Sequence, residues 1–80
     1  MDVELMVVET LRQVTGSEEV VADSNLSLFE TGLLDSMNVV ALLAGLSERL
    51  QTEIPLTAFD QEKWGSPANV VSEVRKLLRT

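Results

Sequence analysis

The spacing of apolar residues along the chain predicts three long helices. Apolar side chains recur at steps of three and four residues, and this spacing gathers them on one face of a helix. The first helix is expected from Val3 to Val14 and ends near Gly16. The second runs from Ser36 to Leu50, and the third follows Ser66-Pro67, a pair that suits a helix start. The residues expected to face the core are Val3, Met6, Val7, Leu11 and Val14, then Val39, Leu42, Leu43, Leu46 and Leu50, then Val70, Val71, Val74, Leu77 and Leu78.

The segments between these helices carry turn-forming residues. In residues 17–34 turn formers alternate with apolar residues, which predicts a long loop that packs down on the helices. Ile54-Pro55 is expected to end the second helix, because proline lacks a donor and disfavours the helical region in the residue before it. A short turn of helix is expected over residues 57–60. Since the pattern contains no strand signal, the fold class is all-α, a small antiparallel bundle of three long helices and one short one, formed as a single domain by residues 1–80.

Composition and charge narrow the function. The chain has 13 acidic and 6 basic residues, a net charge of −7, which disfavours nucleic acid and anionic membrane surfaces as partners. The absence of cysteine and histidine removes disulfides, the usual zinc ligands, a thiol nucleophile and the commonest general base, so we expect a metal-free protein that is not an enzyme. The N-terminus is acidic, unlike a signal peptide, and no apolar run approaches the roughly 18 residues of a membrane span. These features predict an intact, cytoplasmic monomer.

The tract Gly32-Leu33-Leu34-Asp35-Ser36-Met37 is the most informative part of the chain. Asp35 stands directly before the second helix and is a candidate N-cap, whose carboxylate would accept from amides of the first turn. Backbone amides and the positive end of the helix dipole converge at Ser36, where a phosphate esterified to the serine oxygen would be stabilised. From position alone, the simpler interpretation is that Asp35 or Ser36 only caps the helix.

This tract, with Phe29 upstream, resembles the 4′-phosphopantetheine attachment motif of acyl, peptidyl and aminoacyl carrier proteins. Length, acidity, helix pattern and the long first loop extend the resemblance to essentially all 80 residues. The resemblance implies that Ser36 carries a covalent 4′-phosphopantetheine derived from coenzyme A, whose thiol holds cargo as a thioester. It also implies that Asp35 takes part in recognition.

A second resemblance lies downstream. Residues 54–70, which include Phe59-Asp60, Trp64 and Ser66-Pro67, resemble the corresponding tract of D-alanine carrier proteins and of some natural-product aminoacyl or peptidyl carriers. The implied partners are a phosphopantetheinyl transferase, a loading adenylate-forming ligase or acyltransferase, and a downstream acceptor transferase or condensing enzyme. A polyketide or fatty-acid acyl carrier is the alternative within this class, and a helical scaffold without a cofactor is the alternative outside it. The sequence leaves the cargo and the pathway open.

The outward side of the second helix is small and apolar where typical fatty-acid carriers place glutamates. Exposed apolar patches often mark docking surfaces, and a flexible methionine adapts to differently shaped partners. The residues expected to contact partners are Met37, Val40, Ala41 and Ala44, joined by Leu34 and Trp64. The alternative for Val40 and Ala41 is half-burial by the neighbouring loop. The alternative for Trp64 is that it closes one end of the bundle, with its indole N–H turned to a carbonyl or water.

Overall fold

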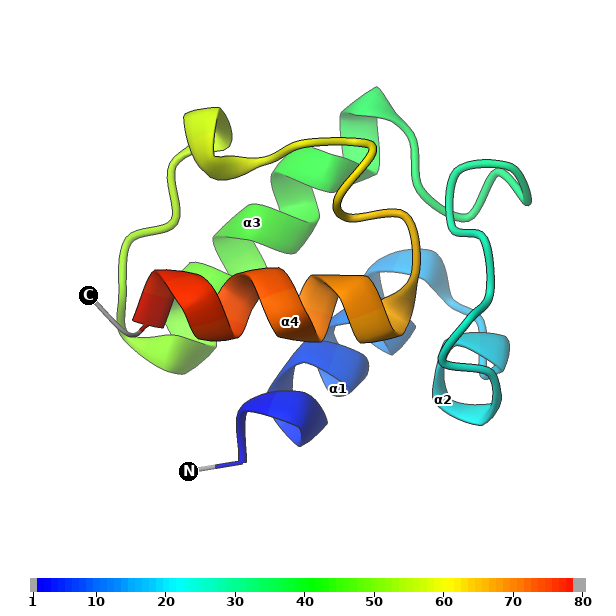
Figure 1. Cartoon of the computed structure of the whole chain (residues 1–80), viewed down its shortest axis with the longest axis horizontal. Helices are drawn as coiled ribbons and strands as arrows, with labels where there is room; N and C mark the ends of the chain where they lie inside the picture. Colours follow the sequence, from blue (N-terminus) through cyan, green and yellow to red (C-terminus); the bar gives the residue numbers. More distant parts are fainter. Residues whose placement is uncertain (1, 79–80) are drawn as a thin grey trace.

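The computed structural model describes residues 2–78, and within this range the chain is helical without strands (Figure 1). The elements are α1 (Val3–Thr15), α2 (Glu19–Ala22), α3 (Ser36–Leu50), a 3-10 turn η1 (Leu56–Ala58) and α4 (Pro67–Leu78). The expected all-α class with three long helices is confirmed. The expected loop over residues 17–34 contains the additional short helix α2, since the Ser17 hydroxyl accepts a hydrogen bond from the Glu19 amide at 3.1 Å and Val20 is buried. No helix in residues 2–78 has the length and apolar character needed to cross a membrane.

Helix α1 is defined by residues at its two ends. Asp2 caps the start, where its carboxylate accepts a hydrogen bond from the Leu5 amide at 3.1 Å. Gly16 ends the helix in the left-handed region at φ 69°, and its amide donates to the Arg12 carbonyl at 2.8 Å. Between these caps α1 packs against both α3 and α4, so it forms the centre of the bundle.

Helix α3 has the expected extent but ends for a different reason. Gln51 adopts a left-handed conformation at φ 52° directly after Leu50, and its amide is bonded to the Ser47 and Glu48 carbonyls. The Ser47 hydroxyl then accepts a hydrogen bond from the Ile54 amide at 2.9 Å. The chain therefore folds back over the last turn of α3 before it reaches Pro55, so the expectation that Ile54-Pro55 ends the helix is wrong.

The core lies between α1, α3 and α4. All five residues of α3 that were expected to face inward are buried, whereas Val3, Met6, Val14, Leu77 and Leu78 are only partly buried at the ends of α1 and α4. The buried apolar residues are Val7, Leu11, Val20, Leu28, Leu34, Val39, Leu42, Leu43, Leu46, Leu50, Ile54, Trp64, Val70, Val71 and Val74.

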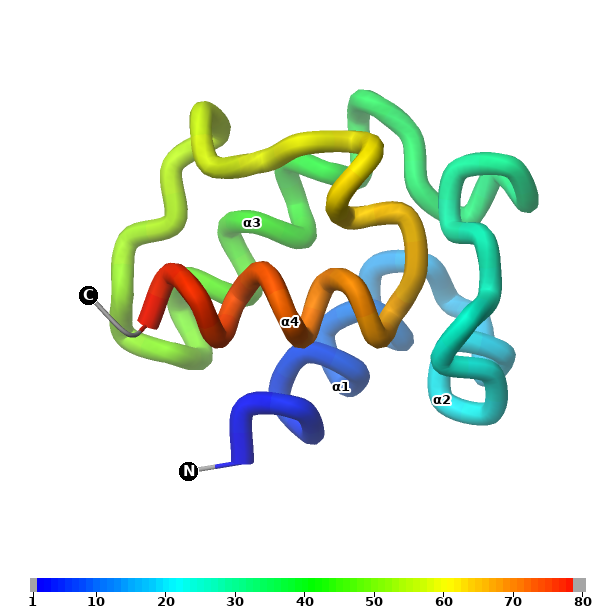
Figure 2. The backbone as a smooth tube through the Cα atoms, in the orientation of Figure 1, coloured from blue at the N-terminus to red at the C-terminus, as the bar shows by residue number. Residues whose placement is uncertain are grey.

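The long connection before α3 is ordered by backbone hydrogen bonds to the segment that leads into α4 and to the first turn of α4. The Leu28 amide donates to the Gly65 carbonyl at 2.8 Å, and the Ala68 amide donates to the Ser24 carbonyl at 3.0 Å. Figure 2 shows the two segments side by side at one end of the molecule. A further bond from the Leu34 amide to the Leu28 carbonyl, at 2.9 Å, closes the loop on itself. The start of α3 is thus held by a fixed loop.

Candidate functional site

The start of α3 presents an exposed serine directly after a well-formed cap. Asp35 has an extended backbone, at φ −145° and ψ −177°, and its carboxylate oxygen Oδ1 accepts hydrogen bonds from the Met37 amide at 2.9 Å and the Asn38 amide at 3.0 Å. The predicted N-cap role of Asp35 is therefore confirmed. Ser36 is the first helical residue, is exposed, and its hydroxyl makes no hydrogen bond with the described part of the chain.

Asn38 completes the cap, a role that was not predicted from the sequence. Its Oδ1 accepts from the Asp35 amide at 2.6 Å, while its Nδ2 donates to the Leu33 carbonyl at 2.8 Å. The side chain thus ties the first turn of α3 to the loop on both sides of Leu34. The signal was available as a capping box in which Asn38 stands where glutamate or glutamine is usual.

Most of the backbone amides that were expected to stabilise a phosphate on Ser36 are already bonded within the helix cap. The Asp35 carboxylate accepts hydrogen bonds from the amides of Met37 and Asn38, and the Asp35 carbonyl accepts one from the Val39 amide at 3.0 Å. Among the described residues of this first turn, only the Ser36 amide is left without a partner. A phosphate on the Ser36 oxygen would therefore lie beside one free donor and a carboxylate, so the expected stabilisation by several amides is wrong.

A groove of about 470 Å³, which we call the Ser36 groove, lies between α3, the preceding loop and η1. Most of the residues that line it are apolar, and Ser36 and Asp35 are among the polar ones. The phenylalanine rings on its two sides pack together with a centroid distance of 5.9 Å. The lining residues are Phe29, Leu34, Asp35, Ser36, Val39, Val40, Leu56, Phe59 and Gln61. This arrangement fits a flexible organic chain attached to the serine oxygen.

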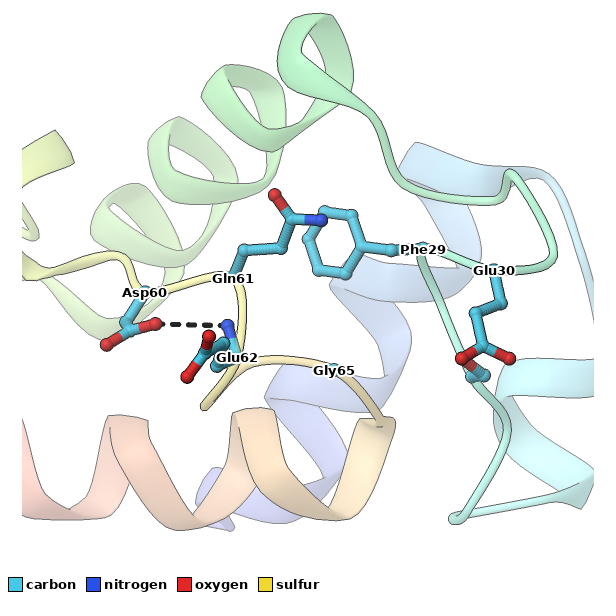
Figure 3. A pocket seen from close by; sticks show the side chains of 7 residues that line it. Phe29, Glu30, Asp60, Gln61, Glu62 and Gly65 are labelled. Carbon is cyan, nitrogen blue, oxygen red and sulfur yellow. Dashed lines mark hydrogen bonds between the residues drawn. The ribbon is translucent and has the colours of Figure 1, made fainter.

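A larger cavity of about 790 Å³ lies next to the groove and shares Phe29 and Gln61 with it. Figure 3 shows Glu30 on one side of this cavity, facing Asp60 and Glu62 on the other. One oxygen of Asp60 accepts a hydrogen bond from the Glu62 amide at 3.0 Å. Three carboxylates make this cavity unsuited to a phosphate, which supports the Ser36 groove as the place for a phosphate-linked group. Within residues 2–78, acidic residues do not gather into a group that could hold a metal ion.

The outward face of α3 is exposed and apolar, as its spacing predicted. Met37 is 84% exposed and Val40 55% exposed, and Ala41 and Ala44 are exposed as well, so the alternative of half-burial by the loop is wrong. Leu56, at 61% exposure, lines the same grooves as Val40 and extends this surface. Its place in an irregular segment gave the sequence analysis no periodic signal.

Leu34 and Trp64 require a correction. Leu34 is 2% exposed and Trp64 is 0% exposed, so both side chains belong to the core and neither contributes to a docking surface. Trp64 closes one end of the core, where its ring meets Phe59 edge to face at a centroid distance of 5.5 Å. Its buried indole N–H has no partner among the described residues, so of the two expected partners, a carbonyl or water, the carbonyl is wrong.

Comparison with known proteins agrees with this geometry. The family model described as the phosphopantetheine attachment site matches residues 7–74, which include α3 and the loop before it, so the chain belongs to this family of carrier proteins. Among individual proteins it is similar to the D-alanyl carrier protein of Latilactobacillus sakei, at 40% identity over 96% of this chain and 99% of that protein. The D-alanyl carrier protein of Enterococcus faecalis is 38% identical over 96% of this chain and 99% of that protein. The D-alanyl carrier protein of Listeria welshimeri is 39% identical over 89% of this chain and 91% of that protein.

The family membership defines the cofactor and the general role. The protein is a carrier that bears a covalently attached 4′-phosphopantetheine, and it resembles D-alanyl carriers over nearly its whole length. This finding sets aside the alternative of a helical scaffold without a cofactor. When the group is bound, its terminal thiol supplies the thioester linkage on which a carrier holds its cargo.

Proposed function

We propose that Ser36 is the attachment site of the phosphopantetheine arm. The observation that supports this most directly is the placement of an exposed, unbonded hydroxyl at the first position of α3, where the residue lines the 470 Å³ groove. Asp35 and Asn38 hold the backbone on both sides of this residue, so the backbone that carries the hydroxyl is fixed in position. A transferase can then approach the serine oxygen without displacing any intramolecular hydrogen bond.

The other serine at the start of a long helix does not offer this arrangement. Ser66 precedes α4, but its hydroxyl accepts a hydrogen bond from the Asn69 amide at 3.3 Å and the residue is half-buried. Modification of Ser66 would remove a helix cap, whereas modification of Ser36 leaves the cap formed by Asp35 in place. Ser66 is therefore a matched negative control for the assignment.

The proposed cargo is D-alanine, held as an aminoacyl thioester. This proposal is supported by the relatives of this chain that are named D-alanyl carrier proteins. An adenylate-forming ligase would load the arm in the cytoplasm after a phosphopantetheinyl transferase has primed Ser36, and an acceptor transferase would remove the cargo. In this scheme residues 1–80 act as one monomeric carrier domain that catalyses none of the steps.

The proposed docking surface for these enzymes is the apolar face next to Ser36, formed by Met37, Val40, Ala41 and Ala44 together with Leu56. These side chains are exposed, Val40 and Leu56 line the Ser36 groove, and Met37 directly follows Ser36, so an enzyme that covers them also receives the arm. Truncating an apolar anchor at an interface commonly costs more than about 1 kcal/mol of binding. Met37→Ala and Val40→Asp are therefore expected to raise the ligase concentration needed for half-maximal loading, while thermal melts stay close to that of the wild type.

Priming is tested by intact mass after incubation with coenzyme A and a broad-specificity phosphopantetheinyl transferase. The wild type and Ser66→Ala should each gain one phosphopantetheine, and Ser36→Ala should gain none although its circular dichroism spectrum remains helical. An arm on the Ser36→Ala variant, or on another residue of the wild type, would overturn the assignment.

Cargo is tested on the primed protein with a D-alanine-activating ligase and ATP. The expected product is a D-alanyl adduct that hydroxylamine releases, with much weaker loading of L-alanine. Efficient acylation from an acyl-CoA by an acyltransferase, without ligase-dependent loading, would instead place the protein among the polyketide or fatty-acid carriers.

A further inference from the structure

The exposed large apolar residues of the described chain fall into two separate groups. Val40 and Leu56 line the Ser36 groove and Met37 directly follows Ser36, but Leu5 and Val21 lie elsewhere, with exposures of 56% and 54%. Leu5 lies off the core-facing stripe of α1, and Val21 follows the buried Val20 in α2. The apolar stripes that build the core do not account for this second pair.

Leu5 and Val21 line one groove, of about 250 Å³, between α1, α2 and the start of α4. We call it the α1–α2 groove, and its lining residues are Asp2, Glu4, Leu5, Val8, Val20, Val21, Ser24, Pro67 and Ala68. In Figure 1, α2 and the start of α1 lie at the lower edge of the molecule, whereas α3 begins at the upper edge. The α1–α2 groove is therefore remote from Ser36 and takes no part in the proposed function.

The charged residues that line this groove are acidic. Asp2 and Glu4 line it, and Glu19 and Asp23 flank the α2 segment that forms its other wall. These four carboxylates form no ion pair within residues 2–78, and the lining contains no lysine or arginine. An apolar floor within an acidic rim is complementary to an apolar side chain carried between basic residues.

We propose that the α1–α2 groove is a second docking site, which binds a basic amphipathic segment of a partner protein. A second copy of this chain does not fit, because each copy carries a net charge of −7 and would bring the same carboxylates together. An anionic lipid surface is repelled for the same reason. Because the site is remote from Ser36, a partner bound there leaves the arm and the α3 face free for a second enzyme.

The probe for this site is a synthetic helical peptide with leucine at steps of three and four residues and lysine elsewhere. Titrated into the nitrogen-15-labelled protein, it should shift the amide signals of α1, α2 and Ala68, and the affinity should fall as salt rises. The same peptide with glutamate in place of lysine should not bind. Shifts confined to the Met37 and Val40 region, or equal binding of the glutamate peptide, would overturn the proposal.

Matched variants separate this groove from the α3 face. Leu5→Asn and Val21→Ser should each weaken peptide binding about tenfold, whereas Val40→Ser should not. Glu4→Gln should weaken binding and reduce its salt dependence, while Glu48→Gln, at an exposed acidic residue of α3, should change neither. Unchanged affinity in both Leu5→Asn and Val21→Ser would refute the assignment, because both side chains are exposed and their loss spares the core.

Two further measurements test the identity of the occupant and the independence of the site. Vesicles rich in phosphatidylglycerol should not shift the α1 and α2 signals, and a shift that Leu5→Asn abolishes would assign the groove to lipid instead. Leu5→Asn should be primed on Ser36 at the wild-type rate. Loss of priming in this variant, with its fold intact, would show that the two surfaces are not separate.

Discussion

The side chain of Asn38 should stabilise the start of α3 through its two hydrogen bonds to the backbone. Replacing Asn38 by alanine removes the acceptor of the Asp35 amide and the donor to the Leu33 carbonyl. A hydrogen bond of this kind contributes about 0.5–1.5 kcal/mol net, and both bonds lie near the surface, so the expected loss is about 1–2 kcal/mol. In a domain of this size 1 kcal/mol lowers the melting temperature by about 4–8 °C, which gives a decrease of about 4–16 °C.

The chain supplies a matched control for this change. Asn69 occupies the third position of α4 after its cap Ser66, as Asn38 occupies the third position of α3 after Asp35. The Asn69 side chain, unlike that of Asn38, makes no hydrogen bond with the described residues. Alanine raises helix propensity equally at both positions, so the difference between the two variants isolates the Asn38 side-chain bonds.

The assay combines a thermal melt with the initial rate of priming. Asn69→Ala should be primed at the wild-type rate and melt at or slightly above the wild-type temperature, whereas Asn38→Ala should melt earlier than Asn69→Ala and be primed several-fold more slowly at temperatures where it is fully folded. The slower priming is expected because the loop no longer holds Asp35 and Ser36 in one orientation. If both variants melt within about 2 °C of each other and are primed equally fast, the inferred role of Asn38 is refuted.

Three further predictions concern the cap, the two faces of α3 and the contact between helices. Asp35→Asn keeps the capping acceptor and removes the charge, so it should slow priming while the melting temperature stays within a few degrees; equal priming rates would show that the carboxylate charge has no recognition role. Ala44→Glu should leave the circular dichroism spectrum helical, because Ala44 lies on the exposed face of α3. Leu46→Glu places an unpaired charge in the core and should unfold the domain. Loss of helicity in Ala44→Glu would contradict the assignment of the exposed and buried faces of α3. Gly45→Ala brings a Cβ within 2.9 Å of the buried Thr10 methyl carbon, so it should lower the free energy of unfolding, measured by chemical denaturation, by about 1–2 kcal/mol. In a Thr10→Ser background, which lacks this methyl group, the same change should raise the free energy of unfolding by about 1 kcal/mol. Additive effects of the two substitutions would exclude steric contact as the cause.

The sequence by itself determined the parts of this protein that depend on local periodicity. Helix α3 has its expected bounds from Ser36 to Leu50, and its inward residues are buried, because spacing along a helix decides which side chains share a face. Asp35 was identifiable as a cap for the same reason, since capping depends on residues within one turn. The resemblance of residues 29–37 pointed to the cofactor, which the family match then confirmed.

Tertiary structure decided whatever depends on segments distant in the sequence. Leu34 and Trp64 are core residues because the loop before α3 and the segment before α4 are bonded to each other, and no local pattern encodes that pairing. Leu56 joins the α3 face only because the chain folds back over Ser47, and Leu5 and Val21 line one groove only because α2 packs on α1. The periodicity of the sequence determines which residues share a helix face. Whether that face is buried or exposed depends on which other segments of the chain pack against it.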